Sequence, residues 1–164
     1  MKKYTQAEFD ALPVIDGKKQ CPTGDYSDIC SFGEGCSFGE GCSFGKVCSF
    51  GEWCSFGKGC SFGKVCSFGE MCSFGEMCSF GERCKCEFGE FYHMCACGGF
   101  GSCDRTTYFF GLTDGGIGVR CGCFAGTIEQ WEAKVRKTHG DSGIAKAYLG
   151  LIEPVRLMMD ERRP

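Results

Sequence analysis

Cysteine is the residue type in this sequence with the most kinds of possible chemistry, because a thiol can form a disulfide, bind a metal ion or act as a nucleophile. The chain has 164 residues, of which 17 are cysteine, 27 glycine and 16 phenylalanine. Ten of the cysteines, from Cys30 to Cys84, recur at every sixth position. This regular spacing favours an architectural role, in which each reduced thiol is a small buried side chain.

Seven cysteines lie off this six-residue lattice and stay open to metal or redox chemistry. Three Cys-X-Cys pairs occur after the regular repeats, and on a strand both sulfurs of such a pair point to one side, as a zinc site requires. The two-residue spacing usual in zinc sites is absent. We therefore expect packed, reduced thiols with no bound metal or other cofactor, and a structural zinc site is the alternative. The off-lattice cysteines are Cys21, Cys86, Cys95, Cys97, Cys103, Cys121 and Cys123.

Basic and aromatic residues in the C-terminal part form the candidate ligand site. Arg105 and Arg120 can bind a phosphate or another anion together with the backbone amides of the glycine-rich segment 98–102. An arginine beside Tyr108, Phe124 or Trp131 can also stack on a nucleobase. The alternative is that these charges are solvated surface residues.

A repeat of six residues makes up most of the elements that must position these groups. Its unit is Phe-Gly-Glu/Lys-X-Cys-Ser: a large apolar residue, a glycine, two variable positions, a small residue and a polar one. We expect Phe and Cys to point inward, and Gly to supply unusual backbone angles at a corner. Inward residues at spacings of four and two do not share one face of an α-helix, so the repeat predicts a coiled strand.

A second period of 18 residues indicates three units per coil. Lys46-Val47 recurs as Lys64-Val65, and Glu52-Trp53 is followed by Glu70-Met71 at the same interval. Stacked coils would then enclose three columns of aromatic rings that alternate with columns of thiols. The expected columns are Tyr26/Phe44/Phe62/Phe80, Phe32/Phe50/Phe68 and Phe38/Phe56/Phe74.

This unit resembles the hexapeptide repeat of left-handed parallel β-helices over residues 26–90. The resemblance implies a mainly β fold, a left-handed parallel β-helix with three hexapeptides per coil, and a homo-oligomer that is trimeric by analogy. Many such proteins are acyltransferases that bind coenzyme A and use a histidine in a loop between coils, so His93 is the catalytic candidate under this alternative. The repeats carry no loop insertion, and we favour a protein that is not an enzyme.

The variable positions of the repeat are expected to face outward and to supply the candidate protein interface. Exposed apolar side chains in such a row are more typical of a protein interface than of a cofactor site. The candidates are Trp53 and Met71, which lie beside Glu34, Glu52 and Glu70, and Lys46 and Lys64 on another face.

A short helical cap is expected before the repeats. Thr5-Gln6-Ala7-Glu8 is a capping box, and the helix that it opens must end at Pro13. Residues 1–25 are therefore expected to form an N-terminal helical cap, followed by the β-helix of residues 26–90.

Residues 91–164 are expected to form a C-terminal α+β (ββαα) cap or oligomerisation module. Its two strands, 106–112 and 117–124, are separated by Asp114-Gly115-Gly116, a strong hairpin signal. A second capping box, 127–130, opens one helix, and another helix is expected from Ser142 with a kink at Pro154.

Overall charge and hydropathy exclude several classes of partner. The formal net charge of −3 is too small to predict nucleic-acid binding by bulk electrostatics. No stretch approaches the ~20 apolar residues of a membrane span, and the N-terminus has no apolar segment typical of a secretory signal. We therefore expect a soluble protein in a reducing cytoplasm, where thiols persist.

Nearly the whole chain is also similar to a group of small phage and prophage proteins. The similarity rests on the Cys-Ser-Phe-Gly runs and on the segments 21–27, 105–110 and 119–127. It implies an accessory protein in the cytoplasm of a bacterial host cell, without a defined activity. Our leading expectation is a binding protein that inhibits host antiviral defence, by sequestering a small nucleotide signal or by blocking a defence protein. A structural adaptor that binds a host protein through an outer face is a further alternative.

Overall fold

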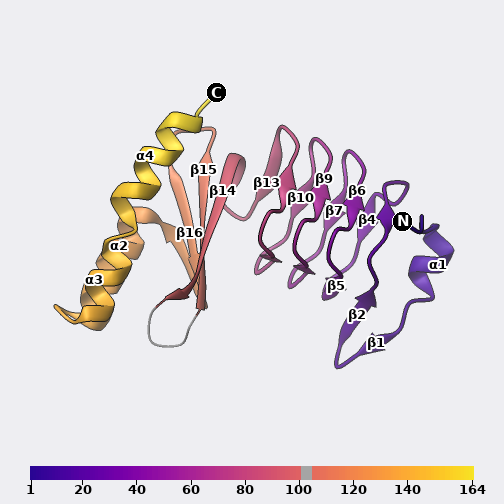
Figure 1. Cartoon of the computed structure of the whole chain (residues 1–164), viewed down its shortest axis with the longest axis horizontal. Coiled ribbons are helices and arrows are strands. Elements are labelled where there is room, and N and C mark those ends of the chain that lie inside the picture. The colour runs from indigo at the N-terminus through magenta and orange to yellow at the C-terminus, as the bar shows by residue number, and fades with distance from the viewer. Residues whose placement is uncertain (101–104) are drawn as a thin grey trace. The chain divides into compact units, whose positions relative to one another are not determined.

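The computed structural model describes residues 1–100 and 105–164 of the chain. These residues form two units, Met1–Gly89 and Glu90–Pro164, each of which has its own fold (Figure 1). Within the described ranges, no helix has both the length and the apolar character needed to cross a membrane.

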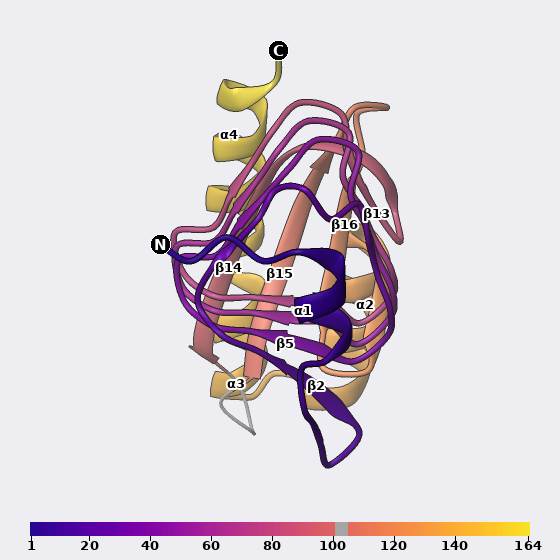
Figure 2. The ribbon, with the colours of Figure 1, turned by 90° about the vertical axis from the view of Figure 1, so that its right-hand side faces the viewer.

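The N-terminal unit is a parallel β-solenoid of about four turns, as the repeat predicts. Strands one coil apart are neighbours in three columns, β3-β6-β9-β12, β2-β5-β8-β11 and β4-β7-β10-β13. Figure 2 shows these coils superimposed along the stack. The strands are β2 (Lys18–Cys21), β3 (Asp25–Tyr26), β4 (Ser31–Phe32), β5 (Cys36–Phe38), β6 (Ser43–Phe44), β7 (Ser49–Phe50), β8 (Ser55–Phe56), β9 (Ser61–Phe62), β10 (Ser67–Phe68), β11 (Ser73–Phe74), β12 (Ser79–Phe80) and β13 (Cys84–Cys86).

The register of these strands confirms the period of 18 residues. Ser43 pairs with Ser61 and Phe44 with Phe62 in parallel strands of successive coils. In the strands of the regular repeat, serine therefore faces outward while phenylalanine faces the interior.

Aromatic rings fill the interior in the three predicted columns. Within a column the rings stack almost parallel: Phe32 and Phe50 have centroids 4.7 Å apart and an interplanar angle of 4°. Between columns they meet edge to face, as Phe56 and Phe62 do at 4.9 Å and 90°. Both arrangements suit the ring quadrupoles. Tyr4 extends one column beyond the repeats, since its ring stacks on Tyr26 at 4.7 Å.

The role expected for the repeat glycine was wrong. The glycine after phenylalanine keeps a negative φ, whereas the residue before cysteine turns the corner with a positive φ, for example 60° at Val47 and 61° at Trp53. The glycine is needed because adjacent coils approach closely: a Cβ on Gly63 would lie 2.5 Å from the Gly45 carbonyl oxygen. The left-handed conformation costs each corner residue that has a side chain about 1–2 kcal/mol.

Buried cysteines alternate with these rings, and their thiols are hydrogen-bonded. The Cys66 thiol donates to the Gly45 carbonyl of the preceding coil at 3.4 Å, and the same bond recurs at Cys54, Cys60 and Cys72. The inward cysteine is therefore a small apolar side chain that also satisfies a glycine carbonyl.

The first lattice cysteine does not follow the expected inward pattern. Cys30 is exposed and Cys78 is half-buried, while the other lattice cysteines are buried. Ile29, only 1% exposed, occupies the interior beside Cys30. Ile29 lacks the positive φ found at the regular corners, so its side chain turns inward, and its carbonyl accepts the Cys48 thiol at 3.3 Å.

The predicted helical cap covers the N-terminal part of the solenoid. Helix α1 (Gln6–Asp10) begins with the Thr5–Glu8 capping box, as expected, and is followed by a hairpin of β1 (Val14–Ile15) with β2. Phe9 on α1 is buried and meets Phe32 edge to face at 5.2 Å. The helix thus shields the first aromatic rings from water.

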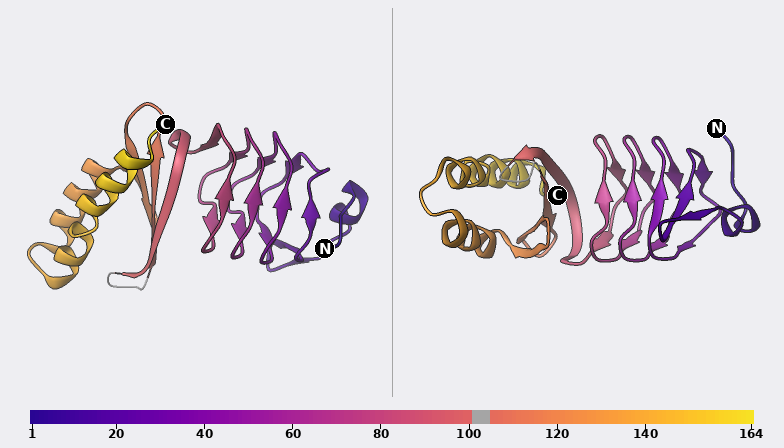
Figure 3. Two further views of the ribbon diagram at one scale, coloured as in Figure 1. Left: turned by 45° about the horizontal axis from the view of Figure 1, so that its top comes forward. Right: turned by 90° about the horizontal axis from the view of Figure 1, so that it is seen from below.

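The C-terminal unit has more elements than the expected ββαα order. It contains four antiparallel strands and three helices within its described residues, and Figure 3 shows the helices on one face of the sheet. Gly122, at φ 59°, breaks the expected 117–124 strand into two, and the expected last helix is broken at Gly150. Pro154 lies in the first turn of the final helix, four residues after Gly150, so a break between two helices replaces the expected kink. The elements are β14 (Gly89–Phe100), β15 (Arg105–Leu112), β16 (Ile117–Cys121), β17 (Phe124–Thr127), α2 (Ile128–His139), α3 (Gly143–Leu149) and α4 (Ile152–Arg162).

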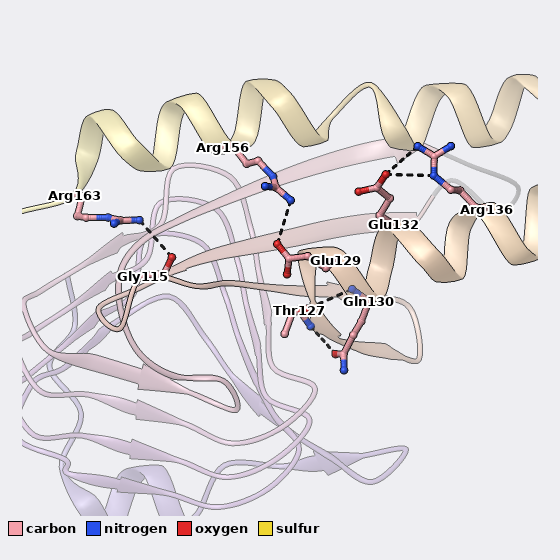
Figure 4. A network of polar contacts seen from close by, with 8 residues as sticks. All are labelled: Gly115, Thr127, Glu129, Gln130, Glu132, Arg136, Arg156 and Arg163. Carbon is pink, nitrogen blue, oxygen red and sulfur yellow. Dashed lines mark hydrogen bonds and ion pairs between the residues drawn. The ribbon is translucent and has the colours of Figure 1, made fainter.

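Polar contacts fix the helices of this unit to one another and to the sheet (Figure 4). The predicted Thr127–Gln130 capping box opens α2. Arg156 on α4 pairs with Glu129 on α2 at 3.1 Å, and Arg163 donates to the Gly115 carbonyl of the β15–β16 turn at 3.4 Å. Trp131 and Val135 of α2 bury their side chains against Phe109 and Val119 of the sheet.

The close approach of the coils gives a testable prediction. Gly69→Ala should lower the free energy of unfolding by about 1–3 kcal/mol, as overpacking typically does, because its Cβ would lie 2.7 Å from the Glu52 amide nitrogen. Gly33→Ala should change it by less than about 0.5 kcal/mol, since no atom lies within 4 Å of that Cβ. Urea unfolding of both variants measures the difference, and equal stabilities would contradict the steric explanation.

Candidate ligand cavity

The C-terminal unit contains a cavity of about 250 Å³ between the sheet and helices α2 and α3. Its wall combines aromatic rings, positive charges and thiols. The residues that define its chemistry are Arg105, Cys121, Phe124, Trp131, Lys134 and Tyr148.

Three local features bring these residues together. Trp131, Lys134 and Thr138 recur at helical spacing and therefore share one face of α2. Trp131 is buried and meets Tyr148 of α3 edge to face at 5.6 Å. The tight turn between β16 and β17 adds Phe124, so the cavity lies where the hairpin end meets two helices.

Two exposed cations flank the aromatic wall. Arg105, at the start of β15, packs its side chain against Gly122 of the β16–β17 turn. Lys134 lines the cavity from α2. Among the described residues, neither side chain forms an ion pair within the molecule, so both charges can bind an anion in the cavity.

The two thiols of the cavity wall, Cys121 and Cys123, have different surroundings. The Thr107 hydroxyl donates to the Cys121 sulfur at 3.2 Å, and the Cys121 thiol lies 3.9 Å from the Tyr148 oxygen. Cys123, in the turn, is exposed. In the described part of the chain, no group of three or more His, Cys, Asp or Glu side chains is arranged to hold a metal ion.

The remaining off-lattice thiols favour a structural role over a reactive one. None of the cysteines that the structure describes forms a disulfide. Burial, followed by the neighbouring Cys97 thiol, raises the pKa of Cys95 to about 12, so this thiol stays protonated and unreactive near neutral pH. Cys103 lies outside the described residues.

The structure separates the three residues expected to form the ligand site. Arg105 lines the cavity. Arg120 and Tyr108 are directly paired across β16 and β15, and strand alternation places them on the sheet face opposite Thr107 and the helices. The Arg120 guanidinium lies 4.9 Å from the centroid of the Tyr108 ring and is only 5% exposed. In the glycine-rich segment 98–102, residues 101 and 102 lie outside the described part.

His93, the candidate under the acyltransferase alternative, is half-buried on β14 and does not line this cavity. Burial, and to a lesser extent the charge of Arg162, lowers the pKa of His93 below its ordinary value. The folded unit therefore favours the neutral imidazole.

The interface candidates lie at the corners of the solenoid. Trp53 is 55% exposed, Met71 is half-buried, and Lys46 and Lys64 are exposed. The Lys64 ammonium pairs with Glu82 of the next coil at 2.8 Å. The outward orientation expected for these positions is thus found at each corner.

Sequence reasoning named Trp131 of helix α2 as a stacking candidate but missed the other residues that α2 contributes to the cavity. Lys134 and His139 both line it. The available signal was the helical spacing of Trp131, Lys134 and Thr138, which places a cation and an aromatic ring on one face.

Comparisons of the chain with protein-family models, curated proteins and solved structures return no match.

The lowered pKa of His93 predicts a pH dependence of stability. Below the ordinary pKa of 6.5, the unfolded chain binds a proton that the folded chain accepts less readily, so stability is lost as pH falls below this value. His93→Gln should therefore lose less stability than the wild type between about pH 7 and 5. Melting temperatures of both proteins across this range measure the difference, and parallel curves would show that His93 does not titrate differently on folding.

Proposed function

We propose that the chain is a non-enzymatic binding protein that takes a small nucleotide-type ligand in the cavity of its C-terminal unit. One observation carries the proposal: the half-buried Phe124 ring, backed by the buried rings of Trp131 and Tyr148, lies beside the two cations Arg105 and Lys134. An aromatic surface favours a planar base, while guanidinium and ammonium groups favour a phosphate.

The size of the cavity limits the ligand. Its volume of about 250 Å³ lies just below the range of roughly 300–1,000 Å³ typical of small-molecule sites. A single base with one phosphate is therefore the largest moiety that we expect it to enclose. A larger nucleotide signal would bind through one such moiety and leave the rest in solvent.

The biological setting that we propose follows from sequence resemblance. The repeats resemble those of left-handed β-helices, and the chain is similar to small phage and prophage proteins. A binding protein of this kind in a bacterial cytoplasm would inhibit antiviral defence by sequestering a nucleotide signal. Blocking of a defence protein is the second form of this proposal, and the 55% exposure of Trp53 favours it.

Ligand binding is tested with the purified chain and a defined panel of adenosine, adenosine monophosphate, cyclic nucleotides, cyclic ADP-ribose isomers and inorganic phosphate. Native mass spectrometry should detect one bound mononucleotide per cavity, and the melting temperature should rise with ligand concentration. The absence of both a bound nucleotide and a thermal shift would contradict the nucleotide proposal.

Removal of a cavity cation should weaken this binding. Lys134→Ala should reduce mononucleotide affinity by about 10- to 100-fold, because a hydrogen bond to a charged group contributes about 1.5–3 kcal/mol. Lys137→Ala is the matched control, since Lys137 is an exposed cation of the same helix as Lys134 and does not line the cavity. Calorimetric titration of both variants measures the effect; equal affinities would place the phosphate elsewhere.

A further inference from the structure

The cavity of the C-terminal unit contains a pair of thiols that the nucleotide proposal does not use. Cys121 and Cys123 both line the cavity, beside Arg105. Cys95 and Cys97, the other Cys-X-Cys pair of this unit, are not among its lining residues. Two thiols that open into one cavity can react in turn with the same ligand molecule.

A tight turn holds these two cysteines close together. Cys121 pairs with Phe124 across β16 and β17, so Gly122 and Cys123 form the two-residue turn between these strands. Consecutive Cα atoms are about 3.8 Å apart, and a bend at Gly122 brings the Cα atoms of Cys121 and Cys123 to roughly 5–6 Å. Disulfides need a Cα separation of about 4.4–6.8 Å. The turn therefore permits a bond between the two sulfur atoms.

The residue between the cysteines has to be glycine, and this brings a positive charge to the turn. Gly122 has a φ of 59°, in the left-handed region that glycine favours. A Cβ at this position would also clash with the guanidinium of Arg105. The Arg105 side chain therefore lies directly against the backbone that joins the two thiols, where its charge can attract an anionic ligand.

The surroundings of the two thiols give them different roles. Cys123 is exposed, so a dissolved ligand can reach its sulfur. Cys121 is half-buried, its sulfur accepts a hydrogen bond from the Thr107 hydroxyl at 3.2 Å, and its thiol lies 3.9 Å from the Tyr148 oxygen. Cys123 is therefore the attacking thiol, and Cys121 is the thiol that reacts second.

We infer that Cys121 and Cys123 form a redox-active dithiol that exchanges with a small disulfide carrying carboxylate groups. The Cys123 thiolate attacks one sulfur of this ligand, its S–S bond breaks, and one half leaves as a thiolate. The Cys121 thiolate then attacks the Cys123 sulfur of the mixed disulfide and releases the second half. The protons lost by the two cysteines pass to the two leaving thiolates. The chain is thereby oxidised to a Cys121–Cys123 disulfide, and the ligand is reduced to two thiols.

Charge and exposure define the class of ligand and the direction of the reaction. Arg105 and Lys134 make the cavity wall positive, which favours a disulfide with carboxylates, such as glutathione disulfide, over a cationic one such as cystamine. A disulfide at the exposed Cys123 belongs to the labile kind, so an excess of the released thiol should reverse the reaction. The inference does not depend on nucleotide binding, because the exchange needs no nucleotide.

Peptide mapping of the full chain tests this reaction. The reduced protein is equilibrated with glutathione and glutathione disulfide at defined ratios, its free thiols are trapped with iodoacetamide, and it is digested with trypsin. Cleavage after Arg120 and Lys134 releases Cys121 and Cys123 in one peptide that has no other cysteine. This peptide should lose two hydrogens as the share of glutathione disulfide rises, and should regain them in excess glutathione.

The same digest contains the control. Cys95 and Cys97 have the same spacing but lie away from the cavity, and they should keep free thiols over the range in which Cys121 and Cys123 are oxidised. The inference would be overturned if peptide 121–134 kept both thiols free over this range. A stable glutathione adduct without a Cys121–Cys123 bond would overturn it as well.

Variants assign the roles of the two thiols and of the charge. Cys121→Ser should accumulate a mixed disulfide between Cys123 and glutathione, whereas Cys123→Ser should slow the exchange at Cys121 at least tenfold. Lys134→Gln should slow the reaction with glutathione disulfide about fivefold, as expected for the loss of a favourable charge, without slowing that with cystamine. Equal slowing with both disulfides would contradict recognition of the carboxylates. Because no nucleotide is present in these assays, failure of nucleotide binding would not change their outcome.

Discussion

The hydrogen-bonded distance between successive coils is the constraint on which the rest of the N-terminal unit depends. Backbone bonds such as Gly69 N–H to the Phe50 carbonyl, at 2.9 Å, hold each coil against the previous one. At this separation a Cβ after phenylalanine would overlap the neighbouring backbone. The same separation between coils stacks the Phe50 ring on the Phe68 ring, with centroids 5.1 Å apart. One spacing therefore explains both residues of each Phe-Gly pair. Each buried ring then contributes about 1.5–3 kcal/mol of hydrophobic stabilisation.

The cysteine excess follows from the same constraint. The cysteine side chain lies beside the rings, where the glycine carbonyl of the preceding coil faces it. Its thiol donates a weak hydrogen bond to this carbonyl, as Cys72 does to Gly51 at 3.4 Å. Alanine would leave this carbonyl without the thiol. The repeated thiols are therefore structural, whereas Cys121 and Cys123 border a cavity.

The sequence alone predicted most of the solenoid, because each residue repeats its environment every 18 positions. The ring columns, the outward serines and both capping boxes followed from spacing. Cys30 did not, because Ile29 belongs to an imperfect first unit whose backbone lacks the left-handed corner. The role of glycine was also misjudged, since a close approach between coils is a property of stacking and not of the local sequence. In the C-terminal unit, residues 117–124 were predicted to form one strand, although a two-residue turn at Gly122 interrupts it.

The cavity was harder to predict because its parts are distant in sequence. Arg105 begins a strand, Phe124 follows a turn, and Trp131 and Tyr148 belong to different helices. No short motif encodes this arrangement; it arises when α2 and α3 cover the sheet. Arg105 and Arg120 looked equivalent as basic residues near aromatic ones, yet strand alternation places them on opposite faces of the sheet. The buried Arg120 guanidinium lies over the Tyr108 and Phe110 rings, whereas the exposed Arg105 lines the cavity. Residue parity along a strand therefore decides which of the two arginines faces the cavity.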